Sequence, residues 1–252
     1  MEVRPAVRVF GVSVDAVDFD AALARVMAWG HARASRYVVL ANVRVVVTAS
    51  READFGRMLA EADMATPDGA PVAWMMRKLG RVGQQRVCGP DLMWALLGRC
   101  AQEGLGVYFY GSTPETLAAL SARAGVAFPG LKVVGAESPP FRPLTELEDA
   151  EAVARINASG AGLVFVGLGC PKQERWMLQH RGRVNAVMLG VGAAFDFHAG
   201  TVSRAPLWMR EHGLEWLHRL GSEPRRLWRR YLVTNTLFVL LATRQLLLRS
   251  GK

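Results

Sequence analysis

Apolar and polar positions follow a regular order along most of this chain. Short apolar runs at 37–41, 107–110, 163–167 and 186–192 are typical of strands buried on both faces of a parallel sheet, and 131–134 reads as a further strand. Between these runs, apolar residues recur every three or four positions, as in helices packed on a sheet. The order predicts an α/β fold, a Rossmann-like parallel sheet flanked by helices.

Capping residues mark the starts of several predicted helices. Asp18 precedes one helical pattern, and Thr145 with Glu148 has the spacing of a capping box before another. Ser112 with Glu115 has the same spacing after the strand at 107–110, where backbone N–H groups could alternatively hold a phosphate. We expect a helix to begin at each of these positions.

Polar or glycine residues follow the predicted strands, and ligands of such sheets bind at the carboxyl ends of the strands. The positions concerned are Asn42, Asp68, Gly111, 169–173 and 192–196. The most constrained is the corner 66–71, Thr-Pro-Asp-Gly-Ala-Pro, where the flanking proline and glycine restrict the chain around Asp68. Pro-Asp-Gly is also a favourable turn sequence, so the corner alone is compatible with a purely structural role.

The composition fits a folded protein of enzyme size. The chain has 252 residues, about half of them apolar, enough for one sizeable core. Three cysteines, Cys88, Cys100 and Cys170, are too few and too scattered for a disulfide framework or a zinc site, which favours a reducing compartment. The first thirty residues lack the apolar run of a secretory signal, so we expect a cytoplasmic location.

Positive charge is concentrated at the C-terminal end. Residues 204–252 hold ten Lys or Arg against three Glu, a charge of +7 out of the total of +9. We therefore divide the chain into an α/β catalytic domain, 1–203, and a basic, Trp/Arg-rich helical appendage, 204–252. A basic segment of this kind is suited to binding phosphates in nucleic acid, anionic lipid or a diphosphate ligand.

The appendage also contains an apolar run, Tyr231–Thr243, that is shorter than the roughly 20 residues needed to span a bilayer. Tryptophan and arginine beside such a run favour a peripheral helix at the membrane surface. The same run is compatible with packing on the body of the protein, or on another subunit in a homo-oligomer. Nucleic-acid binding is disfavoured because the charge accompanies a long apolar stretch.

Several nucleotide and hydrolase chemistries lack their sequence signatures. Gly167-Leu168-Gly169 has no third glycine of a dinucleotide fingerprint, and the chain has neither a Walker loop nor a Gly-x-Ser-x-Gly elbow. Asp18-Phe19-Asp20 matches the Asp-x-Asp pattern of metal-dependent sugar transferases, but it precedes a helix and reads as a capped first turn. Group transfer from a nucleotide donor fits what is left: a carboxylate accepts a hydroxyl proton and cations stabilise a leaving diphosphate.

Five segments in the right order are similar to the WecG/TagA/CpsF glycosyltransferases, glycosyltransferase family 26. The resemblance covers nearly the whole chain. The segments are 67–69 (Pro-Asp-Gly), 86–91 (Arg-Val-Cys-Gly-Pro-Asp), 166–174 (Val-Gly-Leu-Gly-Cys-Pro-Lys-Gln-Glu), 192–196 (Gly-Ala-Ala-Phe-Asp), and 200–206 (Gly-Thr-Val-Ser-Arg-Ala-Pro) followed by 214–216 (Leu-Glu-Trp).

The resemblance implies an inverting, metal-independent enzyme without a cofactor. It moves a hexosamine, typically N-acetylmannosamine or its uronic acid, from a UDP-sugar to a polyprenyl-diphosphate-linked acceptor in cell-surface polysaccharide synthesis. Asp68 matches the family's proposed general base. The matching substrate-binding residues are Asn42, Arg86 and Gln173 around the sugar and acceptor, Asp196 near the nucleotide, and Phe141 as the aromatic residue stacking on uracil.

For the appendage, the resemblance implies docking on the cytoplasmic face of the cell membrane and closure over the active site. Closure brings arginines to the diphosphate, and the candidates are Arg225, Arg226, Arg229 and Arg230. One departure concerns the donor: many members carry Thr where this chain has Leu40. Glucose or glucuronate donors therefore stay open, as does a non-catalytic module that binds nucleotide or membrane.

Overall fold

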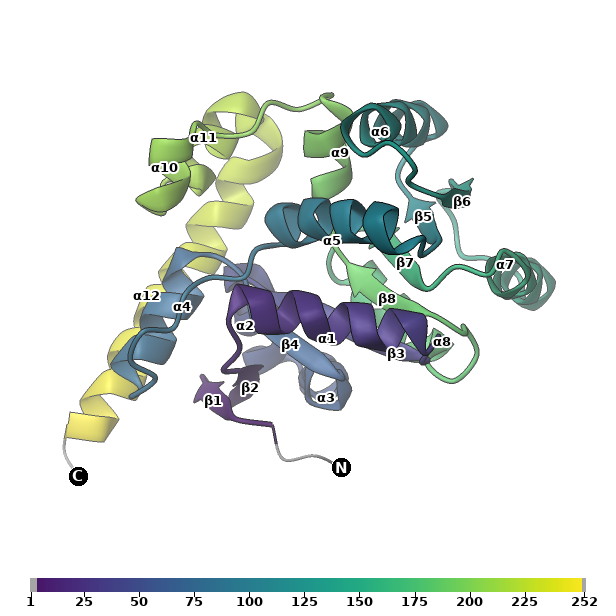
Figure 1. Ribbon diagram of the computed structural model, residues 1–252. Coiled ribbons are helices and arrows are strands. Elements are labelled where there is room, and N and C mark those ends of the chain that lie inside the picture. Colours follow the sequence, from purple (N-terminus) through teal and green to yellow (C-terminus); the bar gives the residue numbers. More distant parts are fainter. Residues whose placement is uncertain (1–3, 251–252) are drawn as a thin grey trace.

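The computed structural model describes residues 4–250, and a six-stranded sheet forms their centre (Figure 1). Every neighbouring pair of strands is parallel, in the order β4-β3-β8-β7-β5-β6. The strands are β3 (Arg36–Ala41), β4 (Met64–Pro67), β5 (Val107–Gly111), β6 (Val133–Glu137), β7 (Leu163–Gly167) and β8 (Val187–Gly190). This confirms the predicted Rossmann-like sheet, although the strand before Asp68, β4, was given no bounds and β6 begins two residues later than expected.

Helices cover both faces of the sheet, so alternate strand residues enter two separate cores. In β7, Val164 and Val166 face one core, whereas Leu163 and Phe165 face the other. The first core is closed by α2 (Val43–Arg51), α3 (Ala53–Glu61), α4 (Ala70–Lys78), α7 (Glu146–Ala158) and α8 (Lys172–His180). The second is closed by α1 (Phe19–His31), α5 (Gly89–Glu103), α6 (Pro114–Ala127) and α9 (Ala194–Ala199).

Most predicted helix starts are confirmed by their hydrogen bonds. Asp18 accepts from the N–H of Ala21 at 2.7 Å, and the capping box between Thr145 and Glu148 is complete. The expected cap at Ser112 is wrong by one residue: Thr113 caps α6. Pro114 at the first helical position keeps Thr113 extended, which is the conformation of an N-cap.

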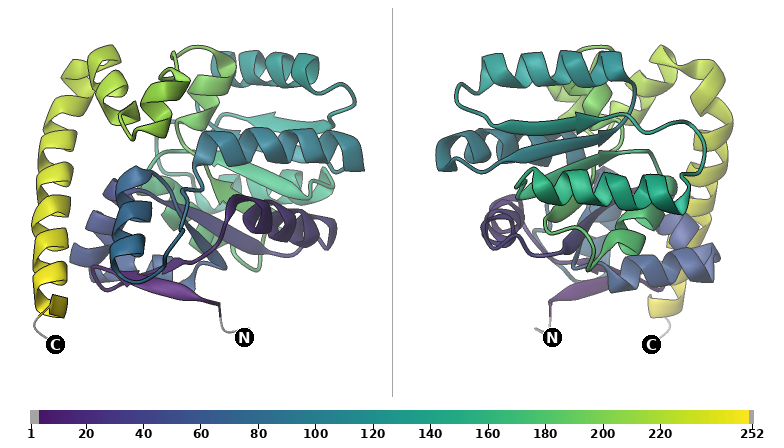
Figure 2. Two further views of the ribbon diagram at one scale, coloured as in Figure 1. Left: turned by 60° about the vertical axis from the view of Figure 1, so that its left-hand side comes forward. Right: turned by 90° about the vertical axis from the view of Figure 1, so that its right-hand side faces the viewer.

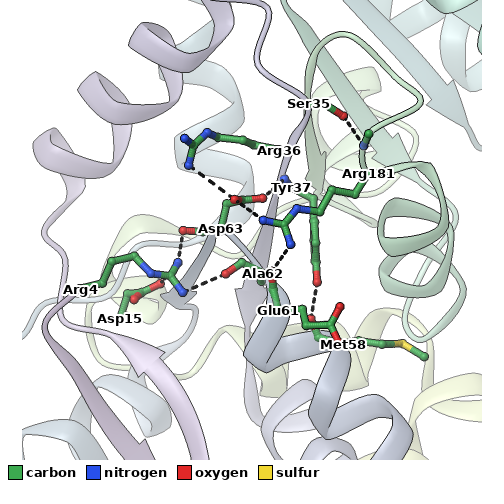
Figure 3. A network of polar contacts seen from close by, with 11 residues as sticks. Arg4, Asp15, Ser35, Arg36, Tyr37, Met58, Glu61, Ala62, Asp63 and Arg181 are labelled. Atoms are coloured by element: carbon green, nitrogen blue, oxygen red, sulfur yellow. Dashed lines mark hydrogen bonds and ion pairs between the residues drawn. The ribbon is translucent and has the colours of Figure 1, made fainter. Parts of the chain in front are cut away.

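A charged cluster closes the amino ends of β3 and β4 (Figure 3). Asp63 accepts hydrogen bonds from the backbone N–H of Tyr37 at 3.0 Å and from Arg181 at 2.9 Å. A hairpin of β1 (Ala6–Val9) and β2 (Val12–Asp15), which was not predicted, supplies Asp15 to the same end of the sheet. Arg4 binds both Asp15, at 3.2 Å, and the carbonyl of Ala62, at 2.9 Å, which ties the hairpin to the chain before β4.

The C-terminal segment forms α10 (Leu207–Glu211), α11 (Glu215–Ser222) and the long α12 (Pro224–Ser250), which runs along one side of the body (Figure 2). Phe238 and Ala242 of α12 are buried against the body, and the ring of Phe238 packs edge-on to Phe10 at 5.0 Å. Gln245 bonds the backbone of the β1–β2 hairpin at both Phe10 and Arg8. Part of the appendage thus packs on the body, one of the two arrangements expected from the sequence.

Helix α12 is longer than the apolar run that the sequence suggested. The stretch 227–249 is long and apolar enough to cross a membrane, with a mean hydropathy of 1.4 over its most apolar window, so the expectation that the segment is too short to span was wrong on length. The hydrogen bonds of Gln245 to the hairpin hold α12 on the body of the protein. The division of the chain after residue 203 stays a prediction.

Candidate active site

A cavity of about 700 Å³ opens at the carboxyl ends of β3, β4, β7 and β8. Its floor comes from the loops that follow these strands, and one wall comes from α11 and α12. Five of the predicted site residues from the body line it: Asn42, Asp68, Arg86, Gln173 and Asp196. The rule that ligands bind at the strand carboxyl ends therefore located the cavity correctly.

Asp68 is held at the end of β4, half-buried in the cavity wall. Its N–H bonds the carbonyl of Ala41 at 3.3 Å, and Gly69, with φ of 89°, turns the chain directly into α4. Burial and the negative charge of Glu215 raise the pKa of Asp68 to about 7, although the amide of Asn42 and the charge of Arg86 oppose this shift. A carboxyl group that titrates near neutral pH is suited to accepting a proton.

Asn42 donates a side-chain hydrogen bond to Asp68. It caps α2, and its Oδ1 accepts from the N–H of Val45 at 3.1 Å. This bond fixes the orientation of the amide, so that Nδ2 points to the Asp68 carboxylate at 3.5 Å. The strand-to-helix junction predicted at Asn42 thus positions both residues.

Gln173 lines the cavity, but its amide is bound within the protein. Oε1 accepts from the N–H of Gly169 at 3.1 Å, and Nε2 donates to the carbonyl of Gly190 and to Glu174, both at 3.0 Å. These bonds join the loop after β7 to the last residue of β8. In this structure Gln173 therefore shapes the cavity floor, and direct contact with a sugar stays a prediction.

The predicted nucleotide residues differ in their placement. Asp196 lines the cavity in the first turn of α9, where its backbone carbonyl accepts from Thr201 and Val202. Phe141 lies on the loop between β6 and α7, does not line the cavity and is 86% exposed. The structure therefore does not bring Phe141 to the other predicted residues, and its stacking on uracil stays a prediction.

Of the four tail arginines, Arg230 is the one that lines the cavity. Arg225 and Arg229 are exposed and outside the lining, and the side chain of Arg226 is not among those described. Desolvation by burial, followed by the positive charges of Arg44 and Arg219, lowers the pKa of Arg230. Positive groups thus gather here, an arrangement suited to an anion.

Arg44 and Arg219 line the cavity and were missed in the sequence. Arg44 follows Asn42 after β3, so its position at a strand end was a usable signal. Arg219 lies on α11. The resemblance implied that the appendage closes over the site, but no pattern singled out this residue. Among the described side chains, no three His, Cys, Asp or Glu residues are grouped to hold a metal ion, and the metal-independent reaction stays a prediction.

Comparison with known proteins adds a family to this geometry. The model of the Glycosyl transferase WecG/TagA/CpsF family matches residues 7–252, which include both the sheet and the three C-terminal helices. A relative from Bacillus spizizenii is 34% identical over 197 residues, 78% of this chain and 74% of the relative. That relative is named N-acetylglucosaminyldiphosphoundecaprenol N-acetyl-beta-D-mannosaminyltransferase.

Proposed function

Because this chain belongs to the WecG/TagA/CpsF family of glycosyl transferases, we propose that it transfers N-acetylmannosamine from a UDP-sugar to N-acetylglucosamine on undecaprenyl diphosphate. The acceptor and the transferred sugar are those in the name of the Bacillus spizizenii relative. The observation that carries the proposal is Asp68, a carboxylate with a pKa of about 7 in the wall of a cavity large enough for a sugar nucleotide.

Asp68 acts as the general base in this proposal. An acceptor hydroxyl attacks the anomeric carbon of the donor, its proton passes to the Asp68 carboxylate, and the bond from that carbon to the UDP oxygen breaks. Attack on the face opposite to UDP inverts the anomeric configuration. The amide of Asn42, fixed by its cap on α2, holds the carboxylate in one orientation for this proton transfer.

Arginines of the cavity stabilise the leaving diphosphate. Arg230 from α12 and Arg44 from α2 line the same cavity, and their mutual repulsion is relieved when an anion binds between them. The charge of Arg86 acts on the Asp68 carboxylate, which indicates that Arg86 lies on that side of the cavity. We assign Arg86 to the sugar and the arginines of α2, α11 and α12 to the diphosphate.

The C-terminal helices dock on the cytoplasmic face of the membrane, where a polyprenyl acceptor is anchored. Large apolar side chains of these helices are exposed although the segment is strongly basic, a combination that suits an anionic lipid surface. They are Leu207, Trp208, Leu217, Trp228, Leu232, Val233, Leu240, Leu247 and Leu248, whereas the exposed Trp216 and Val239 line the cavity. Docking through this surface leaves the buried face of α12 in place against the hairpin.

A glucosyl or glucuronosyl donor is the second candidate, and Leu40 favours it. Leu40 lines the cavity, and it fills the space beside Gly89, where an added Cβ would lie 2.6 Å from its side chain. The hydroxyl found there in many family members is absent, so the pattern of sugar hydroxyls that the site reads differs.

Release of UDP separates these candidates. The full chain is incubated with undecaprenyl-diphosphate-linked N-acetylglucosamine and, in turn, UDP-N-acetylmannosamine, UDP-glucose and UDP-glucuronate. We expect acceptor-dependent release that is fastest with UDP-N-acetylmannosamine, and a product whose anomeric configuration by NMR is opposite to that of the donor. Faster release from either other donor favours the second candidate, and no release from any donor would indicate a non-catalytic binding module.

A further inference from the structure

Three segments that carry the family resemblance meet at one charged cluster beside the cavity. Glu215, at the start of α11, accepts from Arg204 Nε at 3.3 Å and from Arg86 Nη1 at 3.5 Å. Arg204 also forms an ion pair with Asp91 of α5, and the thiol of Cys88 donates to Asp91 at 2.8 Å. The cluster therefore joins 86–91 of the body to the two C-terminal segments, and the proposed proton transfer does not account for it.

Glu215 has a distinctive place in this cluster. Its side chain is 23% exposed, lies between two arginines and lines the same cavity as Asp68. One oxygen faces Arg204, which Asp91 anchors, and the other faces Arg86. The carboxylate is thus held in place on one side and holds an active-site arginine on the other.

Asp91 and Arg204 stabilise each other in their charged forms. Burial alone would raise the pKa of Asp91, but hydrogen bonds from Arg204 and Cys88 outweigh it and lower that pKa. The opposing carboxylates raise the pKa of Arg204, in spite of the burial of its guanidinium. Arg210 of α10 adds a second ion pair to Asp91 at 3.6 Å, so both short helices are attached to the body by charge.

We propose that Glu215 is a positioning residue for the transfer reaction: carried on α11, its carboxylate orients Arg86 and holds negative charge beside Asp68. The proposal rests on the proposed function, because it takes Asp68 as the base. The base is then at full strength only while α11 is attached to the body. Attachment of the C-terminal helices to the body in this way also strengthens the base.

The charges that face Asp68 come from several elements. Glu215 of α11 and Asp91 of α5 disfavour its ionised form, Arg86 and the amide of Asn42 favour it, and Cys88 lies close enough for its thiol to respond to the Asp68 charge. Glu215 is the largest of these influences after burial. Removing its charge therefore lowers the pKa of Asp68, and a weaker base accepts the acceptor proton less readily.

The test is the pH profile of kcat/KM for the full chain and its Glu215→Gln variant. We expect wild type to lose activity below about pH 7, and the variant's midpoint to fall by about one pH unit. We also expect its plateau to fall about tenfold. Glu215→Asp keeps the charge and should keep the wild-type midpoint with a lower plateau. Glu211→Gln, an equal charge change at an exposed position of α10, should match wild type in both.

Two results would overturn the inference: a Glu215→Gln midpoint equal to wild type, or an equal shift in Glu211→Gln. A titration of the Asp68 carboxyl by ¹³C NMR, assigned by its loss in Asp68→Asn, follows the same ionisation without turnover. If wild type releases no UDP, the proposed function fails, and the NMR titration still decides whether Glu215 tunes Asp68. If wild type is active and neither measurement shifts, this inference alone fails.

Discussion

Asp63 and Asp68 lie at the two ends of β4, and they differ in how many hydrogen-bond and ion-pair partners surround each carboxylate. Asp63 forms ion pairs with Arg36 and Arg181 and accepts a hydrogen bond from the N–H of Tyr37, and its side chain is 7% exposed (Figure 3). Asp68 receives one long hydrogen bond from Asn42, and burial raises its pKa to about 7. A carboxylate with its partners in place stabilises the fold, whereas one that lacks them stays available for a proton.

The same contrast holds for the arginines at the two ends of the sheet. Arg4 and Arg181 at the amino end bind carboxylates and backbone carbonyls. At the carboxyl end, Arg44 and Arg230 face a cavity and add to each other's positive charge. Like charges held close together are unfavourable unless an opposite charge lies between them. Their presence at the cavity therefore indicates a binding site for an anionic ligand.

The largest effect on folding is expected from Asp63→Ala. The change leaves the buried N–H of Tyr37 without its acceptor and removes two ion pairs, so we expect the free energy of unfolding to fall by about 3 kcal/mol. Urea denaturation measures it. Asp54→Ala removes an exposed pair with Arg57 on α3 and should cost less than about 1 kcal/mol. Equal losses in the two variants would show that the amino-end cluster has no special role.

A smaller effect is expected from Arg230→Ala at the other end. It removes one positive group from the cavity while Arg44 and Arg219 stay, so we expect kcat/KM for the UDP-sugar to fall about thirtyfold. Arg229→Ala removes an exposed arginine one residue earlier and should change kcat/KM less than about threefold. A reversed order would mean that α12 is turned differently when substrate is bound.

The smallest effect concerns the contribution of Asp68, the proposed base, to stability. The carboxyl of Asp68 ionises near pH 4 in the unfolded chain and near pH 7 in the folded one, so the folded state binds the extra proton between these values. Wild-type stability therefore falls as pH rises from 4 to 7, and Asp68→Asn removes this loss. A pKa difference of about three would correspond to about 4 kcal/mol, but solvent reaching the half-buried carboxyl screens most of it. We therefore expect the variant to be more stable by about 1 kcal/mol at pH 8 and no more stable at pH 4. Thermal denaturation at both pH values measures the difference, and an Asn variant less stable at pH 8 would contradict the raised pKa.

Periodicity was enough to predict the sheet and the cavity edge, because β3, β5, β7 and β8 are apolar except for Arg36 at the start of β3, and all four lie inside the sheet. It failed at β4, an edge strand of four residues whose apolar signal is short. It also failed at the β1–β2 hairpin, where half the side chains face solvent. Short edge elements carry too few apolar positions for a pattern to stand out.

The site was predictable where a residue follows a strand and was not where long-range packing decides. Asn42 and Asp68 follow strands and both line the cavity, as expected from strand ends, whereas the hydrogen bond between them was not predicted. The internal bonds of Gln173 depend on the loop after β8, and the position of Glu215 depends on how α11 folds back on the body. Such contacts join residues far apart in the sequence, so local patterns do not report them.

The central claim is that Asp68 is the base, and the most direct test is Asp68→Asn in the full chain. Single-turnover transfer to the lipid-linked acceptor is measured together with the affinity for UDP, which reports whether the cavity is intact. We predict a loss of transfer of about a thousandfold with the UDP affinity unchanged, because the amide has the shape of the carboxylate but cannot accept the proton. Transfer within about tenfold of wild type would contradict this role.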